Sequence, residues 1–331
     1  MEFPTITLEE HFLSKNTDDG RALPASASKT WEQIRAHTGW LNKLKDVSPN
    51  GSRIKAMDAG RVGMQVLSNS FGVSSSIPSL VAAANDELSA ATVAQPRFKG
   101  FASLPMKHPS EAVRELERCV SELGFVGALI DSHQDDGRYY DDREVWPVFA
   151  KAEELDVPIY IHPTIPMEGV QSALYDGNYD NDFGLLLGIA GWGWHCDTAL
   201  SILRMYGAGL FNAYPKLKVV IGHMGEMLPF MLDRIDEKVS QLAIGQKQSF
   251  REVWAQNIWV TTSGMFTLAP MACLLQTTAL DRILYSVDYP YSTTEQGRNF
   301  LQLLEQSGTV TREHLEMIAY KNAAVLLKLD V

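Results

Sequence analysis

The chain has 331 residues, and its 40 acidic side chains outnumber its 29 basic ones, which gives a formal net charge of -11. This acidic surplus offers no positive surface to a phosphate backbone or to an anionic membrane, so the composition argues against nucleic-acid and membrane partners. Three widely spaced cysteines without a C-x-x-C pair favour a reducing compartment over a disulfide framework. No secretory signal or membrane-spanning run is readable, so we expect a soluble, cytoplasmic protein.

Eight short runs of apolar and β-branched residues recur along the chain, and most are followed by a longer amphipathic segment. This alternation predicts repeated βα units. Because eight parallel strands close a barrel, we expect the α/β class and a (β/α)₈ (TIM) barrel. The predicted strands are residues 5–10, 63–69, 100–104, 126–132, 158–162, 218–223, 258–263 and 283–288.

The segments between the strands have helical periodicity. The clearest example begins with Ser110 as a predicted N-cap and ends before Gly124, as helix capping favours. The predicted helices are residues 110–123, 197–210, 251–256 and 312–327.

No linker or change in composition divides the chain, so we expect one domain over residues 1–331. Two stretches are longer than a barrel needs: residues 13–53 after the first strand and 164–189 after the fifth. Both leave the carboxyl end of a strand, where barrel enzymes build their active sites. We therefore expect both stretches to be active-site loops.

Titratable residues end several of the predicted strands. Glu9 and His11 are two apart on the first strand and therefore point to the same side, whereas Glu10 points to the other. His162 ends the fifth strand and Asp288 the eighth. Singly, each has an ordinary explanation as a hydrogen-bonded structural residue. Together, imidazoles and carboxylates at one barrel mouth match the ligands of a divalent metal, and we predict a Zn²⁺ or Mn²⁺ site, between which these donors do not choose.

The sixth predicted strand ends in His223, and Glu226 follows three residues later. His223 is either a fifth ligand or an acid, base or hydrogen-bond donor to a substrate oxygen. If Gly225 begins a helix, this spacing lets the carboxylate of Glu226 hold the imidazole and fix its tautomer. Arg234, about two helical turns further on, is either a surface ion-pair residue or an anchor for a carboxylate substrate.

These motifs resemble the metal-dependent decarboxylases of the amidohydrolase superfamily, which include aminocarboxymuconate semialdehyde, γ-resorcylate, 2,3-dihydroxybenzoate and 5-carboxyvanillate decarboxylases. The resemblance runs nearly from end to end, and the motifs are specific as a set. They are LEEHF at 8–12, LGFVGA at 123–128, IHP at 161–163, GLF at 209–211, YPKL at 214–217, GHMGE at 222–226, TTSG at 261–264 and DRILYSVDYP at 281–290.

The resemblance implies a (β/α)₈ barrel with a single metal ion. The E-x-H motif falls on Glu9 and His11, the strand-five histidine on His162 and the strand-eight aspartate on Asp288, whereas the fourth strand carries no lysine that could bridge two metals. It also implies that Asp288 protonates the ring carbon bearing the carboxylate of an ortho-hydroxy aromatic acid, before carbon dioxide leaves.

The same resemblance assigns substrate contacts. His223 with Glu226 supports a substrate oxygen, and Arg234 lies where the family has a substrate-binding arginine. The chain departs from the family at Asp131, where hydroxybenzoate decarboxylases usually have an asparagine facing the substrate; an ionised aspartate would repel an anion there. His195, at a predicted helix start near the mouth, could contact the substrate, although packing explains it equally well. Tyr291 could wall an aromatic ring, although aromatic residues at such spacing more often belong to the core.

The leading hypothesis is therefore a carbon–carbon lyase that decarboxylates a hydroxylated aromatic acid without oxidation. An alternative in another reaction class is a metal-dependent hydrolase or hydratase of a lactone or an unsaturated dicarboxylic acid. A third is a barrel without activity that serves as a scaffold and binds no metal tightly. By resemblance we also expect a homodimer or a homotetramer, with a small aromatic carboxylate as the only other partner.

Overall fold

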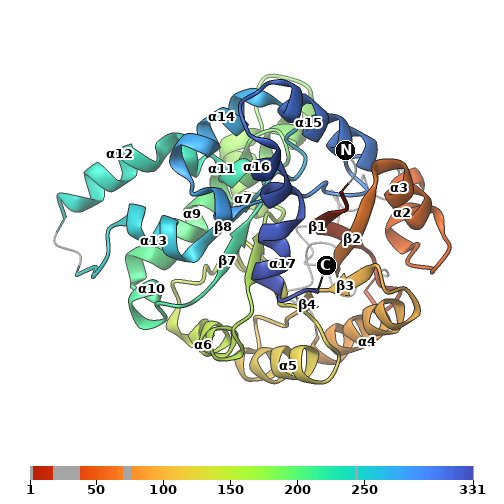
Figure 1. Cartoon of the computed structure of the whole chain (residues 1–331). Coiled ribbons are helices and arrows are strands. Elements are labelled where there is room, and N and C mark those ends of the chain that lie inside the picture. The colour runs from red at the N-terminus through yellow and green to blue at the C-terminus, as the bar shows by residue number, and fades with distance from the viewer. Residues whose placement is uncertain (1–2, 18–37, 70–76, 243–244, 331) are drawn as a thin grey trace.

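The computed structural model describes residues 3–17, 38–69, 77–242 and 245–330. Its strands lie at the centre, surrounded by helices (Figure 1). All strand pairs are parallel, and they form a three-stranded sheet, β1-β2-β3, and a six-stranded sheet, β4-β5-β6-β7-β8-β9. The strands are β1 (Thr5–Phe12), β2 (Val62–Asn69), β3 (Phe98–Gly100), β4 (Ala102–Ser103), β5 (Ala128–Asp131), β6 (Ile159–His162), β7 (Val219–Ile221), β8 (Ile258–Thr261) and β9 (Ile283–Leu284).

The two sheets close into one barrel. β3 and β4 are two parts of the predicted third strand: the first part pairs with β2, and the second pairs with β5. At the other seam, a parallel bridge joins Glu10 to Tyr289, and the backbone N–H of His11 donates to the carbonyl of Tyr289 at 2.7 Å. The predicted (β/α)₈ barrel is therefore confirmed, with its third strand interrupted at Phe101.

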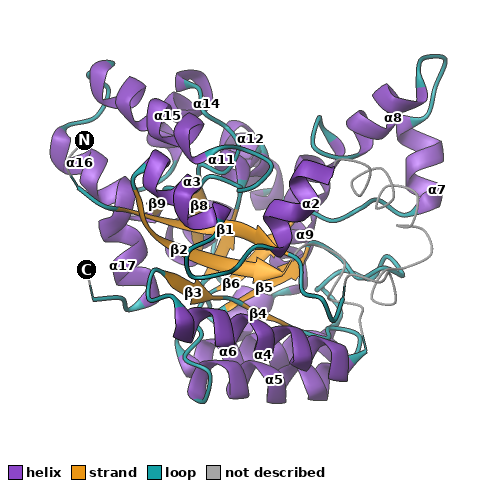
Figure 2. Ribbon diagram, turned by 90° about the vertical axis from the view of Figure 1, so that its right-hand side faces the viewer, coloured by secondary structure: helices purple, strands orange, loops and turns teal. Residues whose placement is uncertain are grey.

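Helices surround the barrel, and α7 and α8 stand out from one side of it (Figure 2). The predicted helix from residue 110 begins one residue earlier, at Pro109, and the preceding His108 provides no side-chain cap; proline fits the first helical turn because an N–H there has no helical partner. The longer helices are α4 (Pro78–Ala94), α5 (Pro109–Ser121), α6 (Trp146–Leu155), α9 (Gly193–Ala208), α12 (Leu228–Ser240), α13 (Phe250–Asn257), α14 (Leu268–Thr277) and α15 (Thr294–Gln306).

Shorter helices fill the loops and the carboxyl-terminal segment. The stretch after the first strand contains α2 (Thr38–Lys45) and α3 (Ser52–Gly60), while its residues 18–37 lie outside the described residues. The stretch after the fifth predicted strand contains α7 (Glu168–Val170), η4 (Gln171–Tyr175) and α8 (Asn181–Gly188). The others are η3 (Arg143–Val145), α10 (Leu210–Ala213), α11 (His223–Glu226), η5 (Leu280–Arg282), α16 (Arg312–Glu316), η6 (Met317–Lys321) and α17 (Asn322–Leu327).

Two layers of apolar side chains hold the barrel together. The larger core lies between the strands and the helices, as shown by Ile130 of β5 packing in one cluster with Leu116 of α5. The smaller core fills the barrel interior with alternate strand residues, including Leu8 and Leu129, and α17 adds side chains to it. No helix within the described ranges has both the length and the apolar character needed to cross a lipid bilayer.

Candidate metal centre and active site

Side chains from the ends of β1, β6, β7 and β9 meet at one end of the barrel interior. His162 Nε2 lies 3.2 Å from Glu9 Oε1, and His11 Nε2 lies 3.2 Å from Asp288 Oδ1. His223 Nε2 lies between the two carboxylates, 3.7 Å from Glu9 Oε1 and 3.8 Å from Asp288 Oδ2. Each of the five side chains therefore has a potential ligand atom within 4 Å of another.

The donor atoms in this cluster fit a divalent cation. Two groups have mutually close ligand atoms, Glu9 with His11 and His162, and Glu9 with His223 and Asp288, with all atoms of a group within 4.8 Å of one another. Glu9 Oε1 and His11 Nε2 are buried and accept or donate no hydrogen bond. Buried polar atoms of this kind need a partner, and a metal ion between them would satisfy both. The structure thus brings the four predicted ligands together, with His223 beside them.

Charge coupling within the cluster sets the protonation of its members. Burial alone would raise the pKa of Glu9, but the charges of His223, His162 and His11 outweigh it and lower that pKa. Burial alone would lower the pKa of His162, but its ion pair with Glu9 outweighs it and raises that pKa. For His11, burial prevails and lowers the pKa. In the absence of a metal, a proton on His162 is favoured by the buried carboxylate of Glu9, and a metal ion would take its place.

A chain of hydroxyl groups holds the carboxylate of Glu9 in place. Tyr160, two residues before His162 on β6, is fully buried, and its hydroxyl donates to Glu9 Oε2. The Tyr160 hydroxyl also lies 2.9 Å from Oγ1 of Thr261 at the end of β8, which in turn lies 2.6 Å from Oγ of Ser263, two residues further along the chain. One oxygen of Glu9 is therefore fixed by hydroxyls and the other faces the ligand atoms. Tyr160 was not predicted, although its spacing of two from His162 places it on the same face of the strand.

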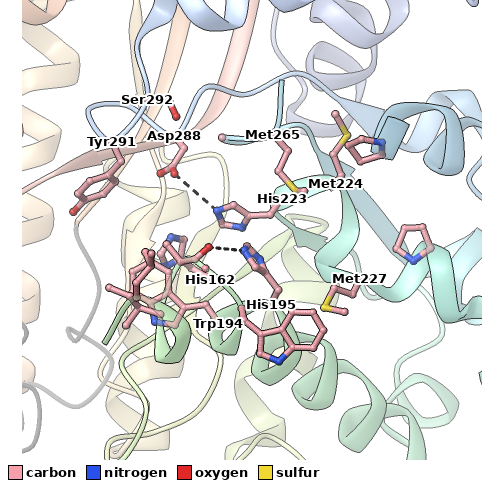
Figure 3. Close-up of a pocket in the computed structure, with 18 of the residues that line it drawn as sticks. His162, Trp194, His195, His223, Met224, Met227, Met265, Asp288, Tyr291 and Ser292 are labelled. Atoms are coloured by element: carbon pink, nitrogen blue, oxygen red, sulfur yellow. Dashed lines mark hydrogen bonds and ion pairs between the residues drawn. The ribbon is translucent and has the colours of Figure 1, made fainter. Parts of the chain in front are cut away.

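Glu226 joins two histidines. Its two carboxylate oxygens accept from Nδ1 of His223 and from Nδ1 of His195, each at 2.7 Å. Burial alone would lower the pKa of His223, but the charges of Glu226 and Glu9 outweigh it and raise that pKa well above its usual value. His223 lies between Asp288 and His195 in Figure 3. The imidazole is thus oriented by Glu226 and directs its other nitrogen to the metal-ligand cluster.

The backbone around this pair differs from the helix expected at Gly225. Residues 223–227 all have positive φ angles, between 47° at His223 and 90° at Gly225, and α12 begins only at Leu228. Gly225 is required there, because a Cβ would lie 2.7 Å from Pro229. This tight turn, and not a helical spacing, brings Glu226 to His223.

A cavity of about 880 Å³ opens onto the cluster. His162, His195, His223 and Asp288 contribute its polar part. The remaining wall is largely apolar and includes Trp40, Phe230, Trp194 and Tyr291, of which Trp194 and Tyr291 are labelled in Figure 3. No lysine or arginine is among the described residues that line it, so an anionic substrate would find positive charge only at the metal centre and at the imidazoles.

Two predicted substrate contacts are not among the residues that line the cavity. Arg234 is on α12, which leads outward from the barrel (Figure 1), and its side chain is 62% exposed and 3.9 Å from Glu237. Within this chain, Arg234 therefore fits the interpretation as a surface ion-pair residue. Asp131 is buried at the end of β5, in register with His162, but it does not line the cavity. His195 and Tyr291 do line it, as predicted for residues near the mouth.

Comparison with known proteins identifies relatives of the chain. The amidohydrolase family profile matches residues 34–329. Decarboxylase orsB of Emericella nidulans is 42% identical over 99% of this chain and 98% of its own length, and γ-resorcylate decarboxylase of Polaromonas sp. is 34% identical over 98% of both. A crystal structure of dihydroxybenzoic acid decarboxylase from Polaromonas sp., with bound manganese and the inhibitor 2-nitroresorcinol, is 32% identical and superposes with a TM-score of 0.83 over 98% of this chain and 97% of the other.

These relatives are named as decarboxylases, which are carboxy-lyases, so the enzyme class predicted from the sequence is confirmed. Manganese in the related crystal structure agrees with the predicted cofactor, and the donor set described above suits the same ion. The match extends over the whole barrel, including the strand ends that carry Glu9, His162 and Asp288. The chain therefore belongs to the amidohydrolase family.

Proposed function

We propose that the protein catalyses the non-oxidative decarboxylation of a hydroxylated aromatic carboxylic acid. The observation that carries the proposal is the position of Asp288, which lies at a fitting metal centre and also lines a largely apolar cavity. A carboxyl group in that place is within reach of both the metal-bound end of a substrate and its ring. The decarboxylase relatives support the same reaction class.

In this proposal Glu9, His11, His162 and Asp288 hold one Mn²⁺ or Zn²⁺ ion. When bound, the ion supplies Lewis-acid charge for the carboxylate and hydroxyl oxygens of the substrate. Asp288 donates a proton to the ring carbon that carries the carboxylate, forming a C–H bond. The bond between that carbon and the carboxylate then breaks, its electron pair restores the aromatic ring, and carbon dioxide leaves.

His223 binds and orients the substrate in this proposal. The charges of Glu226 and Glu9 raise the pKa of the imidazole and so favour its protonated form, and Glu226 holds the Nδ1 side. The Nε2–H therefore points into the cluster, where it donates to a substrate oxygen. His195 shares Glu226 and lines the cavity, so it adds a second, more exposed imidazole to the same hydrogen-bonded group.

The apolar wall of the cavity contacts the aromatic ring of the substrate in this proposal. Aromatic side chains such as Trp40, Trp194 and Tyr291 offer faces and edges to an aromatic ring, and they limit the access of water to the reacting carbon. Because the described lining lacks lysine and arginine, a substrate with a second carboxylate would bury that charge without a partner. The geometry thus supports a monocarboxylic acid with hydroxyl groups near its carboxylate.

The test is an assay of manganese-loaded protein with a panel of hydroxybenzoic acids, following carbon dioxide release and the phenolic product. Reaction in D₂O should place one deuterium on the carbon that lost the carboxylate. Benzoic acid, which lacks the hydroxyl, is the matched control substrate and should not react. Absence of carbon dioxide from every hydroxylated acid with metal bound would refute the proposal. Solvent ¹⁸O in a product that retains all its carbons would instead support the hydrolase or hydratase alternative.

A further inference from the structure

Glu10 is a buried carboxylate between two metal-ligating positions, and its side chain serves a different part of the barrel. Its Oε1 accepts from the backbone N–H of Val287 at 3.0 Å and from Ser286 Oγ at 3.1 Å. Its Oε2 accepts from the backbone N–H of Tyr289 at 3.2 Å and from Gln65 Nε2 at 3.3 Å. Four donors therefore converge on one carboxylate that is fully shielded from solvent.

Two of these donors flank Asp288. Val287 and Tyr289 are its neighbours in the chain, and both donate their backbone N–H to Glu10. Asp288 itself has a φ of 69°, in the left-handed region, which costs a residue with a side chain about 1 kcal/mol or more. Such a conformation persists only where the surroundings fix it, and the carboxylate of Glu10 clamps the backbone on both sides.

Arg53 completes the arrangement from α3. It is fully buried, its guanidinium donates to the carbonyl of His11, and it stacks over the ring of Tyr289 with 4.8 Å between Cζ and the ring centroid. It also supplies positive charge close to Glu10. The end of β1 and the segment after β9 are thus tied together by side chains that lie outside the metal centre.

We propose that Glu10 is a positioning residue that fixes Asp288 in the metal centre by binding the two peptide groups on either side of it. Glu10 touches neither a metal ligand atom nor the cavity, so it acts through the backbone. The inference rests on the proposed metal centre but not on the identity of the substrate. It predicts that loss of Glu10 weakens metal binding in a protein that has Asp288 and not in a protein that lacks it.

The Glu10→Gln substitution tests this because glutamine keeps the size of the side chain. One end of the amide is an NH₂ group, and it would face either the N–H of Val287 or that of Tyr289, both of which are donors. Gln65 can turn its own amide around, but a backbone N–H cannot. The clamp therefore loses one side, and the segment carrying Asp288 is no longer held.

The experiment is a double-mutant cycle on Mn²⁺ affinity, measured by titration calorimetry without substrate. Glu10→Gln should weaken Mn²⁺ binding about tenfold in the native background, in the range found when groups that support metal ligands are removed. In the Asp288→Ala background the same substitution should change the affinity by less than about twofold, because the two sites are coupled. The electron paramagnetic resonance spectrum of bound Mn²⁺ should also change with Glu10→Gln, since the position of a ligand has changed.

Asn85→Ala is the matched control for general damage. Asn85 is equally buried, binds the backbone of Ser103 through two hydrogen bonds and lies outside the metal centre, so its loss should lower the melting temperature without changing Mn²⁺ affinity. An equal loss in both backgrounds of the cycle, or no loss in the native background, would overturn the proposal. If Glu10→Gln does not fold, Gln65→Met removes one donor to Glu10 and should give the same pattern with a smaller loss.

Discussion

The hydroxyl of Tyr160 offers a direct test of how the metal centre is supported. Tyr160→Phe removes this hydroxyl and keeps the ring, so the packing of the barrel interior is unchanged. The oxygen Glu9 Oε2 then loses its hydroxyl donor, and the carboxylate can rotate about its terminal bond. Glu9 Oε1 accepts no well-aligned hydrogen bond, so the contact with His162 at 3.2 Å is the main interaction left to hold the carboxylate.

The size of the effect follows from the charge of the acceptor. A hydrogen bond to a charged group contributes about 1.5–3 kcal/mol, which corresponds to a factor of about 10–150 in an equilibrium constant. Part of this is lost in the metal-free protein as well, because Glu9 is ionised there too. We therefore expect the low end of the range, a Kd for Mn²⁺ raised about tenfold, together with a lower melting temperature of the metal-free protein.

Titration calorimetry with Mn²⁺ measures the change, and Tyr285→Phe is the matched control. Tyr285 is also fully buried, but among the described residues its hydroxyl has no hydrogen-bond partner. Its removal should leave both the Mn²⁺ affinity and the melting temperature close to native values. If Tyr160→Phe binds Mn²⁺ as tightly as Tyr285→Phe, the hydroxyl chain does not support the metal site and the reasoning fails.

Three further predictions concern proton transfer and metal binding. Asp288→Asn should abolish carbon dioxide release at saturating Mn²⁺, because the acid is lost; turnover near the native rate would contradict the role of Asp288. Glu226→Gln should lower kcat about 100-fold while the Mn²⁺ content stays constant, because His223 no longer retains its proton. The affinity for Mn²⁺ should fall as the pH falls, because the raised pKa of His162 favours a proton on the imidazole that the metal must displace. Calorimetry in two buffers of different ionisation enthalpy should detect the release of this proton.

The fold could be predicted because the pattern that specifies it is local. Each barrel strand is a short apolar run, and each run predicts a strand whichever neighbours it pairs with. The interruption of the third strand was not predicted. The register of its two parts depends on β2 on one side and β5 on the other, and a single run of residues 100–104 contains no information about that change of partner.

The metal ligands could be predicted because the spacing of two within a strand determines which side chains share a face. The contacts that orient them could not, since they join distant parts of the chain. Tyr160 and Glu9 are 151 residues apart in sequence, and only the closed barrel makes them neighbours. Arg234 illustrates a different case: its spacing from His223 left a surface ion pair and a substrate anchor equally open, and within this chain its exposed side chain lies beside Glu237.

β1 carries two adjacent carboxylates in different environments: Glu9 belongs to the metal centre, and Glu10 binds the segment after β9, where the barrel closes. Glu9 faces three imidazoles, and their charges outweigh burial and lower its pKa. Glu10 faces mostly neutral donors, and burial opposes its charge and raises its pKa. β1 shifts register between Thr7 and Glu10, and from Glu9 to Glu10 the side chains then alternate between opposite faces, where the environment sets their chemistry. A one-residue insertion before Glu9 would turn Glu9 and Glu10 each to the other's face of the strand. It would therefore remove both the metal site and the clamp on Asp288.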